Sequence, residues 1–549
     1  MVLLETSLSM LSRQVGKQLS VEELSEALFQ FGMELDSFEG DSVRVEITPD
    51  RPDMLSTQGL ARALKGYLGS ELGLPEYHVE NSEIEVVVDA SVEGVRPKTV
   101  AAVVRNLELD SEKIREIIWV QEKLHNTFAR GRKKAALGIY PLERITPPIR
   151  YTARDPSKVK FVPLEATQEM TGWDVLEKHP TGKAFKHLLE GHSAFPFFID
   201  SKNQVLSMPP IVNSHNIGKV TESTRDVFIE VSGHDLKALK QLLNIIVTMF
   251  FDMGGQVCNV KMVYPSESFY SPHLKPEKFV LPTRLVNDVL GAKLTFEEVA
   301  FYLKKMRHGV ISASEKEVEV LVPAYRVDVL HNVDLVDDVG RALGFDKIAP
   351  ALPSTPTTAA VLRESVLTAR RLRDYLKGFK FQDVFTLALT NSKTQFEKMS
   401  LPETPCVKLS EAEARAEGIN MLRCWMTPEL LRVFSSNKHR QFPQQIFEVG
   451  YVVLPDGKAD SKARNAMKAC MLSSHSKASY SEMKSILESV CGAFGLKLAI
   501  HSEDKPFCLP GRCARILVNG KEGWLGELHP QVLENFGLEN PVAGFEFEV

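Results

Sequence analysis

The sequence predicts an α+β protein of several domains, two of which are copies of one helix–strand–helix unit. Three observations predict this fold. The chain has 549 residues, more than one hydrophobic core fills. Two distant segments repeat each other at a fixed offset, and β-rich stretches alternate with helical ones around them. The composition, 44% hydrophobic and 25% charged residues, is typical of a globular protein and excludes a disordered or fibrous one.

The repeat relates residues 20–69 to residues 295–344. Both copies begin with a capping box, one at Ser20 and one at Thr295, so the offset is 295 − 20 = 275 residues. Each continues with an amphipathic helix, an alternating strand and a second helix that ends near a glycine. The aligned apolar positions are Leu24, Ala27, Leu28 and Phe31 with Val299, Tyr302, Leu303 and Met306, then Val43, Val45 and Ile47 with Val318, Val320 and Val322.

The two copies differ in their acids. The second copy carries Asp328, Asp334, Asp337 and Asp338, where the first has Asp53, Gly59, Arg62 and Ala63. If residues 332–343 form a helix, the last three acids lie on one face. Carboxylates so placed suit a hard cation such as Mg²⁺ or Ca²⁺. The alternative is an acidic first turn that the helix dipole favours and that faces solvent or an arginine.

The segment between the copies, about 80–270, predicts a compact α+β domain. Its ends, IEVVVD at 84–89 and VCNVKMVYP at 257–265, are typical of strands and enclose more helical material. A basic run at 130–134 indicates a solvated face, with phosphate contact as the functional alternative.

Residues 206–235 gather hydroxyls, an amide and carboxylates. Composition alone favours a polar loop followed by the strand DVFIEV, in which Val227, Ile229 and Val231 point one way. The spacing indicates no Ser/His/Asp or Cys/His nucleophile, so hydrolysis here would use a water held by polar groups. The polar set is Ser207, Asn213, Ser214, Thr221, Ser223, Thr224, Asp226, Glu230 and Asp235.

After a predicted linker at 353–356, the remaining residues predict a long helix at 364–379 and hairpin-like strands at 447–457 and 514–526. Asn519 and Gly520 are typical of a type I′ turn. Arg512 and His529 are interpreted as a turn arginine and a helix-capping histidine rather than as a site.

Composition excludes several other classes of protein. The longest apolar stretch, 242–251, is about half of what crossing a bilayer requires and predicts a buried helix, so no membrane partner is expected. The N-terminus indicates neither a secretory peptide nor an organelle presequence. Seven cysteines without metal-ligand spacing favour the reducing cytoplasm. A net charge of −5 excludes a histone-like surface but leaves local nucleic-acid contacts open.

Four long motifs follow one another along the chain. They are EITPDRPDMLSTQGLARAL at 46–64, MPPIVNSHNIGKVTESTRDVFIEVSG at 208–233, VPAYRVDVLHNVDLVDDVGRALGF at 322–345 and GRCARILVNGKEGWLGELHPQVLENFGLENPVAGFEFEV at 511–549. Over essentially the whole chain they resemble the beta subunit of phenylalanine–tRNA ligase in its shorter, archaeal and eukaryotic cytosolic form.

The resemblance implies four domains: an N-terminal repeat domain with a DNA-binding-like fold at 1–79, an editing domain at 80–270, a second repeat domain at 271–352, and at 353–549 a class II synthetase-like antiparallel-sheet domain. It implies an α2β2 ligase whose alpha subunit charges tRNA(Phe) with phenylalanine and ATP, while this chain hydrolyses mischarged Tyr-tRNA(Phe). Asp328, Asp334, Asp337 and Asp338 match the family's Mg²⁺ ligands, in a site completed by the alpha subunit.

For editing, the resemblance combined with the polar segment predicts a set of pocket residues. Leu206 is expected as a wall and Asn213 as a polar clamp, Ser214 and Thr221 as orienting groups, and Thr224, Asp226 and Glu230 as recognition groups for the tyrosine hydroxyl. An apolar synthetic pocket cannot strongly reject that hydroxyl, which is why a second site that binds it is useful. Tyr140 departs from the family's pattern, since many relatives carry His there. The alternatives are a non-catalytic nucleic-acid or protein-binding scaffold and a free-standing tRNA deacylase.

Overall fold

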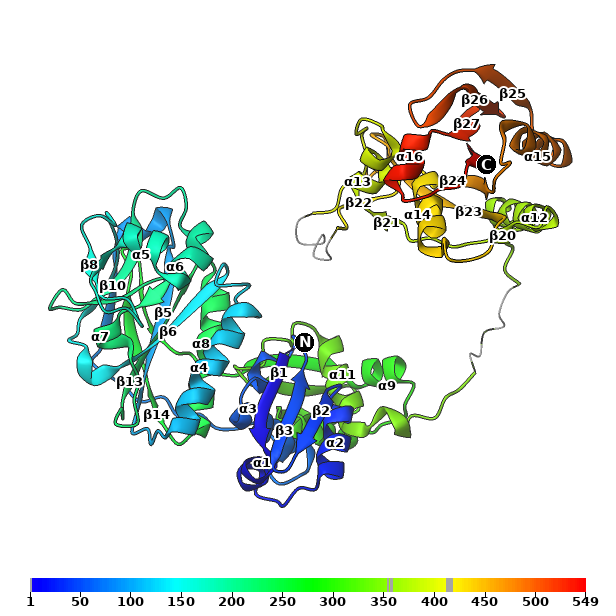
Figure 1. Cartoon of the computed structure of the whole chain (residues 1–549). Coiled ribbons are helices and arrows are strands. Elements are labelled where there is room, and N and C mark those ends of the chain that lie inside the picture. The colour runs from blue at the N-terminus through cyan, green and yellow to red at the C-terminus, as the bar shows by residue number, and fades with distance from the viewer. Residues whose placement is uncertain (1, 353–354, 356–358, 411–417) are drawn as a thin grey trace. The chain divides into compact units, whose positions relative to one another are not determined.

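The computed structural model describes residues 2–352, 355, 359–410 and 418–549. The chain divides into two compact units, Met1–Leu352 and Pro353–Val549 (Figure 1). The linker predicted at 353–356 lies outside the described residues except for Thr355. Within the described ranges, no helix combines the length and apolar character needed to cross a bilayer. Both units mix helices with sheets, so the predicted α+β class is confirmed.

The internal repeat is a six-element unit, longer than the sequence predicts. In each copy a strand and a helix precede the predicted helix, and one more strand lies between that helix and the predicted strand. The three strands form an antiparallel sheet with the last strand in the middle. The first copy comprises β1 Val2–Ser7, α1 Leu8–Val15, α2 Val21–Gln30, β2 Glu34–Glu39, β3 Ser42–Ile47 and α3 Thr57–Tyr67. The second comprises β17 Glu277–Pro282, α9 Thr283–Leu290, α10 Phe296–Lys305, β18 Gly309–Ala313, β19 Glu317–Val322 and α11 Asn332–Leu343.

Local sequence explains why the copies fold alike. Both capping boxes form: Ser20 and Thr295 accept the N–H of the glutamate three residues on, and each glutamate accepts the cap N–H in return. Along β3 and β19 every second residue is buried, as the alternation predicts. The leading strands β1 and β17 share no such pattern, which is why the repeat is visible in the sequence only from the capping boxes onward.

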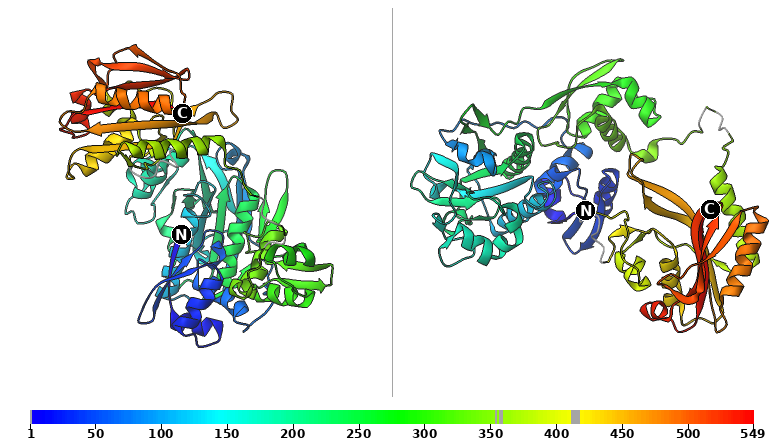
Figure 2. Two further views of the ribbon diagram at one scale, coloured as in Figure 1. Left: turned by 90° about the vertical axis from the view of Figure 1, so that its right-hand side faces the viewer. Right: turned by 90° about the horizontal axis from the view of Figure 1, so that it is seen from above.

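The two copies lie side by side within the first unit (Figure 2). Helix α3 approaches α10 so closely that a Cβ on Gly66 would lie 2.3 Å from the carbonyl oxygen of Lys305. The Gly73 N–H donates to the Lys304 carbonyl at 2.8 Å, and Arg307 pairs with Glu71 at 2.7 Å. The copies therefore form one packed body that shares a hydrophobic core with α8.

The central segment of the first unit has two sheets that face each other between helices. Alternate residues of β5 enter two different cores: Val100, Ala102 and Val104 face the helices α4 and α8, while Ala101 and Val103 face the second sheet. The four-stranded sheet has the order β14-β5-β13-β6 (β14 Gln256–Cys258, β5 Lys98–Arg105, β13 Val227–Gly233, β6 Ala135–Pro141), covered by α4 Ser111–Asn126 and α8 Leu236–Asp252.

The second sheet has seven strands and carries short helices on its far face. The predicted strand at 84–89 is β4, and the stretch at 257–265 bends at Asn259 into β14 and β15, which belong to different sheets. The order is β12 Val212–Asn213, β11 Val205–Met208, β10 Phe195–Ile199, β7 Ile149–Arg154, β4 Glu85–Val88, β15 Val260–Val263 and β16 Ser268–Ser271, with α5 Gly172–Lys178 and α6 Pro180–Phe185 beyond it.

The second unit is built on a mainly antiparallel seven-stranded sheet between helices. The predicted long helix is α12 Glu364–Gly378, and it packs with α15 Tyr480–Ala493 on one face. Helices α14 Thr427–Asn437 and α16 Pro530–Asn535 contact the other face. The order is β20 Gln382–Asp383, β23 Gln444–Pro455, β24 Ala463–Ser474, β28 Val542–Glu548, β27 Lys521–Leu528, β26 Cys508–Val518 and β25 Leu498–Ser502.

The local predictions for this unit are largely confirmed. Asn519 and Gly520 have φ of 50° and 81°, as a type I′ turn between β26 and β27 requires. His529 Nδ1 accepts the N–H of Gln531 and caps α16. Arg512 is exposed and lies 3.9 Å from Glu527. The segment 447–457 is not itself a hairpin: most of it belongs to the single strand β23, whose partner is β24.

Candidate functional site

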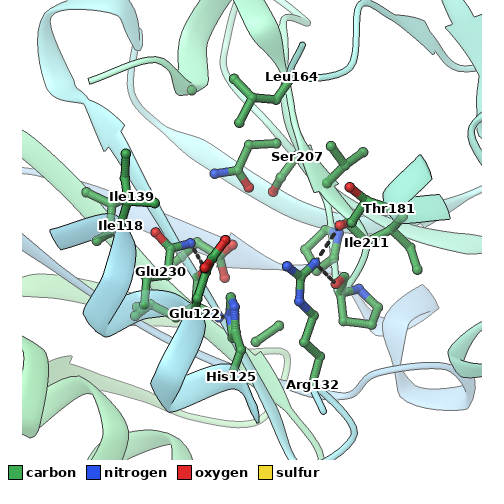
Figure 3. A pocket seen from close by; sticks show the side chains of 18 of the residues that line it. Ile118, Glu122, His125, Arg132, Ile139, Leu164, Thr181, Ser207, Ile211 and Glu230 are labelled. Carbon is green, nitrogen blue, oxygen red and sulfur yellow. Dashed lines mark hydrogen bonds between the residues drawn. The ribbon is translucent and has the colours of Figure 1, made fainter. Parts of the chain in front are cut away.

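A cavity of about 280 Å³ opens at the edge of the two sheets in the central segment. Strands β6, β11 and β12, helix α4 and the segment before α6 contribute its walls, and in Figure 3 Glu230 and Arg132 approach from opposite sides. The volume suits an amino-acid side chain. Apolar and polar groups share the lining, which includes Ile117, Ile118, Gln121, Glu122, His125, Arg132, Ile139, His179, Thr181, Ser207, Ile211, Asn213 and Glu230.

Glu230 is the most unusual residue of this cavity. It lies on the β13 face opposite Val227, Ile229 and Val231, whose predicted common direction is confirmed, so its carboxyl group is buried between the sheets. The Tyr140 hydroxyl lies 3.0 Å from Glu230 Oε1 and 3.2 Å from Asn213 Oδ1, and its one proton serves one of them at a time. Among the described residues, Oε2 has no hydrogen-bond partner. Burial raises the pKa of Glu230 to about 8, against the smaller opposing effect of the Tyr140 hydroxyl.

Gly138 makes room for this carboxyl group. It stands directly across from Glu230 in the β13–β6 pair, on the edge strand of the sheet. A Cβ there would lie 2.1 Å from the Tyr140 hydroxyl oxygen and 2.6 Å from Glu230 Oε1. The absence of a side chain at position 138 therefore allows the Tyr140–Glu230 hydrogen bond to form.

We expect Gly138→Ala to displace both side chains and to cost about 1–3 kcal/mol of stability through overpacking. Hydrogen exchange of the β6 and β13 amides measures the loss. Gly94→Ala is the matched control, since a Cβ there meets no atom within 4 Å. Equal protection in the two variants would contradict this account of Gly138.

Two histidines contribute ring nitrogens to the lining. His125 Nε2 accepts the Leu137 N–H at 2.8 Å, which places its proton on Nδ1, and burial lowers its pKa to about 3. His179 Nε2 donates to the Leu164 carbonyl at 3.0 Å. Both Nδ1 atoms are buried without a hydrogen-bond partner among the described residues. Such groups suit a bound polar molecule.

The predicted pocket residues separate into two groups. Asn213 and Glu230 line the cavity. Leu206 is fully buried in the core between the sheets, and Ser214 begins the short helix α7 His215–Gly218. Thr221 and Thr224 contact each other within a turn, and Asp226 Oδ1 accepts the Asn106 N–H at 3.1 Å. The structure does not bring this second group into the lining.

Sequence reasoning missed the residues that come from farther away. On β11 the predicted pocket residue is Leu206, whereas Ser207, predicted only as a member of the polar set, lines the cavity, because adjacent side chains of a strand point to opposite faces. His125 and Arg132 belong to α4 and the turn after it, about 80 to 100 residues before Asn213 and Glu230. The basic run at 130–134 and the QEKLH before it were the only local signals for them.

The predicted Mg²⁺ ligands do not converge in this structure. Asp328 and Asp338 both accept from Arg326, at 2.7 and 2.8 Å, and Asp338 also lies 2.6 Å from His308. Asp334 accepts two backbone N–H groups before α11, and Asp337 pairs with Arg341 at 2.7 Å. In the part of the chain that the structure describes, no three His, Cys, Asp or Glu residues form a group suited to a metal ion. The four acids so arranged do not fit a metal site. The predicted Mg²⁺ site, which the alpha subunit would complete, stays a prediction.

Three family models match the chain. They are the "Phe-tRNA synthetase beta subunit B1 domain" at residues 1–70, the "tRNA synthetase B5 domain" at 279–345 and the "Phenylalanyl tRNA synthetase beta chain CLM domain" at 348–549. The first two cover the two copies of the repeat, and the third covers the second unit. Fold and matches together define a subunit of the aminoacyl-tRNA synthetase class.

Similarity over the full length identifies the family. The chain is 36% identical to the phenylalanine–tRNA ligase beta subunit of Thermococcus sibiricus, covering 98% of this chain and 96% of the relative. It is 37% identical to that of Pyrococcus furiosus, covering 98% and 97%. A crystal structure of an N-terminal fragment of the phenylalanyl-tRNA synthetase beta subunit from Pyrococcus horikoshii superposes with a TM-score of 0.60 at 36% identity, over 62% of this chain and 99% of the fragment. The chain belongs to the phenylalanine–tRNA ligase beta-subunit family.

Proposed function

We propose that the cavity around Glu230 hydrolyses the ester bond of tyrosyl-tRNA(Phe), so that this chain edits the product of a phenylalanine–tRNA ligase. The observation that carries the proposal is the buried carboxyl group of Glu230, one oxygen of which has no hydrogen-bond partner among the described residues and lies in a cavity that isoleucines and polar side chains line together. A phenol hydroxyl would pair with that oxygen, whereas a phenyl ring would leave it unpaired. A site built around a hydroxyl in this way discriminates strongly against the analogue that lacks it.

The carboxyl group suits a phenol in either protonation state. With a pKa of about 8, Glu230 is mainly protonated at neutral pH and then donates its proton. When it is ionised, it accepts hydrogen bonds from the phenol and from Tyr140. Ile117, Ile139 and Ile211 would contact the ring. Asn213 stands beside Tyr140, and its amide group would orient the attacking water or the ester carbonyl. No step requires a nucleophilic side chain or a metal.

The experiment measures deacylation of Tyr-tRNA(Phe) and Phe-tRNA(Phe) by the complex of this chain with its alpha subunit. We expect rapid hydrolysis of the tyrosyl ester alone, and a decrease of about 10²-fold in Asn213→Ala, since one orienting hydrogen bond is lost. Asp226→Asn is the control, because Asp226 lies outside the lining. Wild-type hydrolysis no faster than in buffer would refute the proposal.

We also propose that the chain joins a phenylalanine–tRNA ligase alpha subunit in an α2β2 enzyme, in which the alpha subunit activates phenylalanine with ATP and charges tRNA(Phe) in the cytoplasm. The names of the relatives and the match of residues 348–549 to the CLM model support this. Seven free cysteines are consistent with a reducing compartment. Co-expression of the two chains, followed by mass measurement of the complex, tests the assembly. A chain that remains alone would favour the scaffold or the free-standing deacylase.

A further inference from the structure

The basic run at 130–134 forms a tight turn at the cavity. Arg130, Gly131 and Arg132 have φ of 51°, 62° and 65°, three consecutive left-handed residues of which two carry side chains. Such a conformation is costly for arginine and persists only where its surroundings enforce it. Strain of this kind concentrates at functional sites, which makes the turn a candidate for a role of its own.

The turn is held in place by backbone and side-chain contacts. The Arg132 N–H donates to the His125 carbonyl at 3.1 Å, and the Lys134 N–H donates to the Ala129 carbonyl at 2.9 Å. The Arg132 guanidinium points inward, where it donates to the carbonyls of Pro210 and Ile211 at 3.2 and 2.7 Å. Arg132 therefore fixes the turn to the cavity wall.

Two cationic residues lie close to Arg132 in the sequence. Arg130 and Lys133 are exposed, and neither forms an ion pair with any residue that the structure describes. Since consecutive Cα atoms are about 3.8 Å apart, the Cα atoms of Lys133 and Arg130 lie within about 4 and 8 Å of that of Arg132, which lines the cavity. Lys219 adds a third exposed cation between two lining residues, Gly218 and Val220. The cavity lining also contains two acidic residues, Glu122 on α4 and Glu165 before β9, and neither belongs to this turn.

We infer that Arg130 and Lys133 bind the phosphodiesters of the 3′-terminal nucleotides of the tRNA whose aminoacyl ester enters the cavity. This inference rests on the proposed editing function and names how the same site holds its RNA. An ester on the terminal ribose is followed at once by phosphates, so cations fixed beside the rim meet them as the ester enters. A rigid turn holds those cations without the entropy cost of ordering a loop.

The test compares wild type with Arg130→Ala/Lys133→Ala in the complex with the alpha subunit. Deacylation of Tyr-tRNA(Phe) is measured across a series of KCl concentrations, beside hydrolysis of a tyrosyl ester of adenosine, which has no phosphate. Each phosphate contact on a single strand contributes about −0.7 to the slope of log affinity against log salt. We expect the variant to lower kcat/KM for the tRNA, to flatten its salt slope by about 1.4, and to leave adenosine ester hydrolysis unchanged.

Two further variants separate charge from structure. Arg130→Lys/Lys133→Arg keeps both charges and should keep the wild-type slope. Lys293→Ala/Lys316→Ala removes two exposed charges from the second repeat, which contributes nothing to the cavity lining, and should change neither substrate. A wild-type slope in the Arg130→Ala/Lys133→Ala variant, or equal losses with both substrates, would overturn the inference. A wild-type complex inactive on both substrates would instead refute the editing function itself.

Discussion

Glu230→Gln should stabilise the first unit at pH 8, and Glu230→Ala should remove the discrimination between tyrosyl and phenylalanyl esters. Burial raises the pKa of Glu230 from 4.5 to about 8 in the folded protein. Between those values the folded state holds a proton that the unfolded state releases, so the stability present below pH 4.5 is lost as the pH rises to 8 and beyond. Glutamine keeps an acceptor for Tyr140 and carries no charge. We expect a gain on the order of 2–4 kcal/mol at pH 8 that vanishes near pH 4.

Hydrogen exchange of the β13 and α8 amides, followed from pH 5 to pH 8, separates this gain from the stability of the second unit. Deacylation of Tyr-tRNA(Phe) is measured on the same samples. Asp226→Asn serves as the matched control, because Asp226 is only half-buried. A gain that is independent of pH would show that the Glu230 carboxyl group is not titrating. Unchanged discrimination between the tyrosyl and phenylalanyl esters in Glu230→Ala would remove Glu230 from hydroxyl recognition.

The sequence predicts best what depends on neighbouring residues. Capping boxes and alternating valines are local patterns, and an offset of 275 residues was enough to relate two domains whose elements coincide in the structure. The strand direction of Val227, Ile229 and Val231 is likewise local. It implied that Glu230 points to the opposite face, but not that a second sheet covers that face. Burial between two sheets is what raises the Glu230 pKa.

The cavity itself depends on contacts that no local pattern encodes. Gly138 faces Glu230 only because β6 pairs with β13 in that register. His125 reaches the same cavity because α4 packs over β6. Conversely, residues adjacent in the polar segment, such as Thr224 and Asp226, were expected in the pocket because they are close in sequence. They bond within a turn and to Asn106 instead.

The four aspartates of the second copy also show that a local pattern does not predict contacts between elements. The helical spacing of Asp334, Asp337 and Asp338 was read correctly, since α11 contains all three. Spacing on one helix says nothing about partners on other elements. Arg326 comes from the segment before α11 and pairs with Asp328 and Asp338, and His308 comes from the turn between α10 and β18 and contacts Asp338. The alternative in which an arginine faces the acids therefore describes Asp328, Asp337 and Asp338 better than the metal site does.

Arg326→Met should destabilise the first unit more than any other single change considered for it. The Arg326 side chain is 2% exposed and is shared by Asp328 and Asp338, whose side chains are 13% and 4% exposed. Removing the shared cation leaves two carboxylates buried close together, and breaking a buried pair in this way costs about 3–5 kcal/mol. The guanidinium now holds the pKa of both carboxyl groups below the ordinary value of 3.8.

The lowered pKa of the Asp328 and Asp338 carboxyl groups determines how the loss of stability in Arg326→Met depends on pH. In wild type the ion-pair stabilisation is present above pH 3.8 and is lost as the pH falls below it. In Arg326→Met the unpaired carboxylates take up protons more readily, so the deficit should be largest at pH 7 and shrink toward pH 4. Hydrogen exchange of the α3 and α11 amides measures it. Arg284→Met is the control, because the Arg284–Asp288 pair is exposed and worth at most about 1 kcal/mol. A deficit no larger than that of the control, or one that added Mg²⁺ removes, would show that Arg326 does not hold these acids.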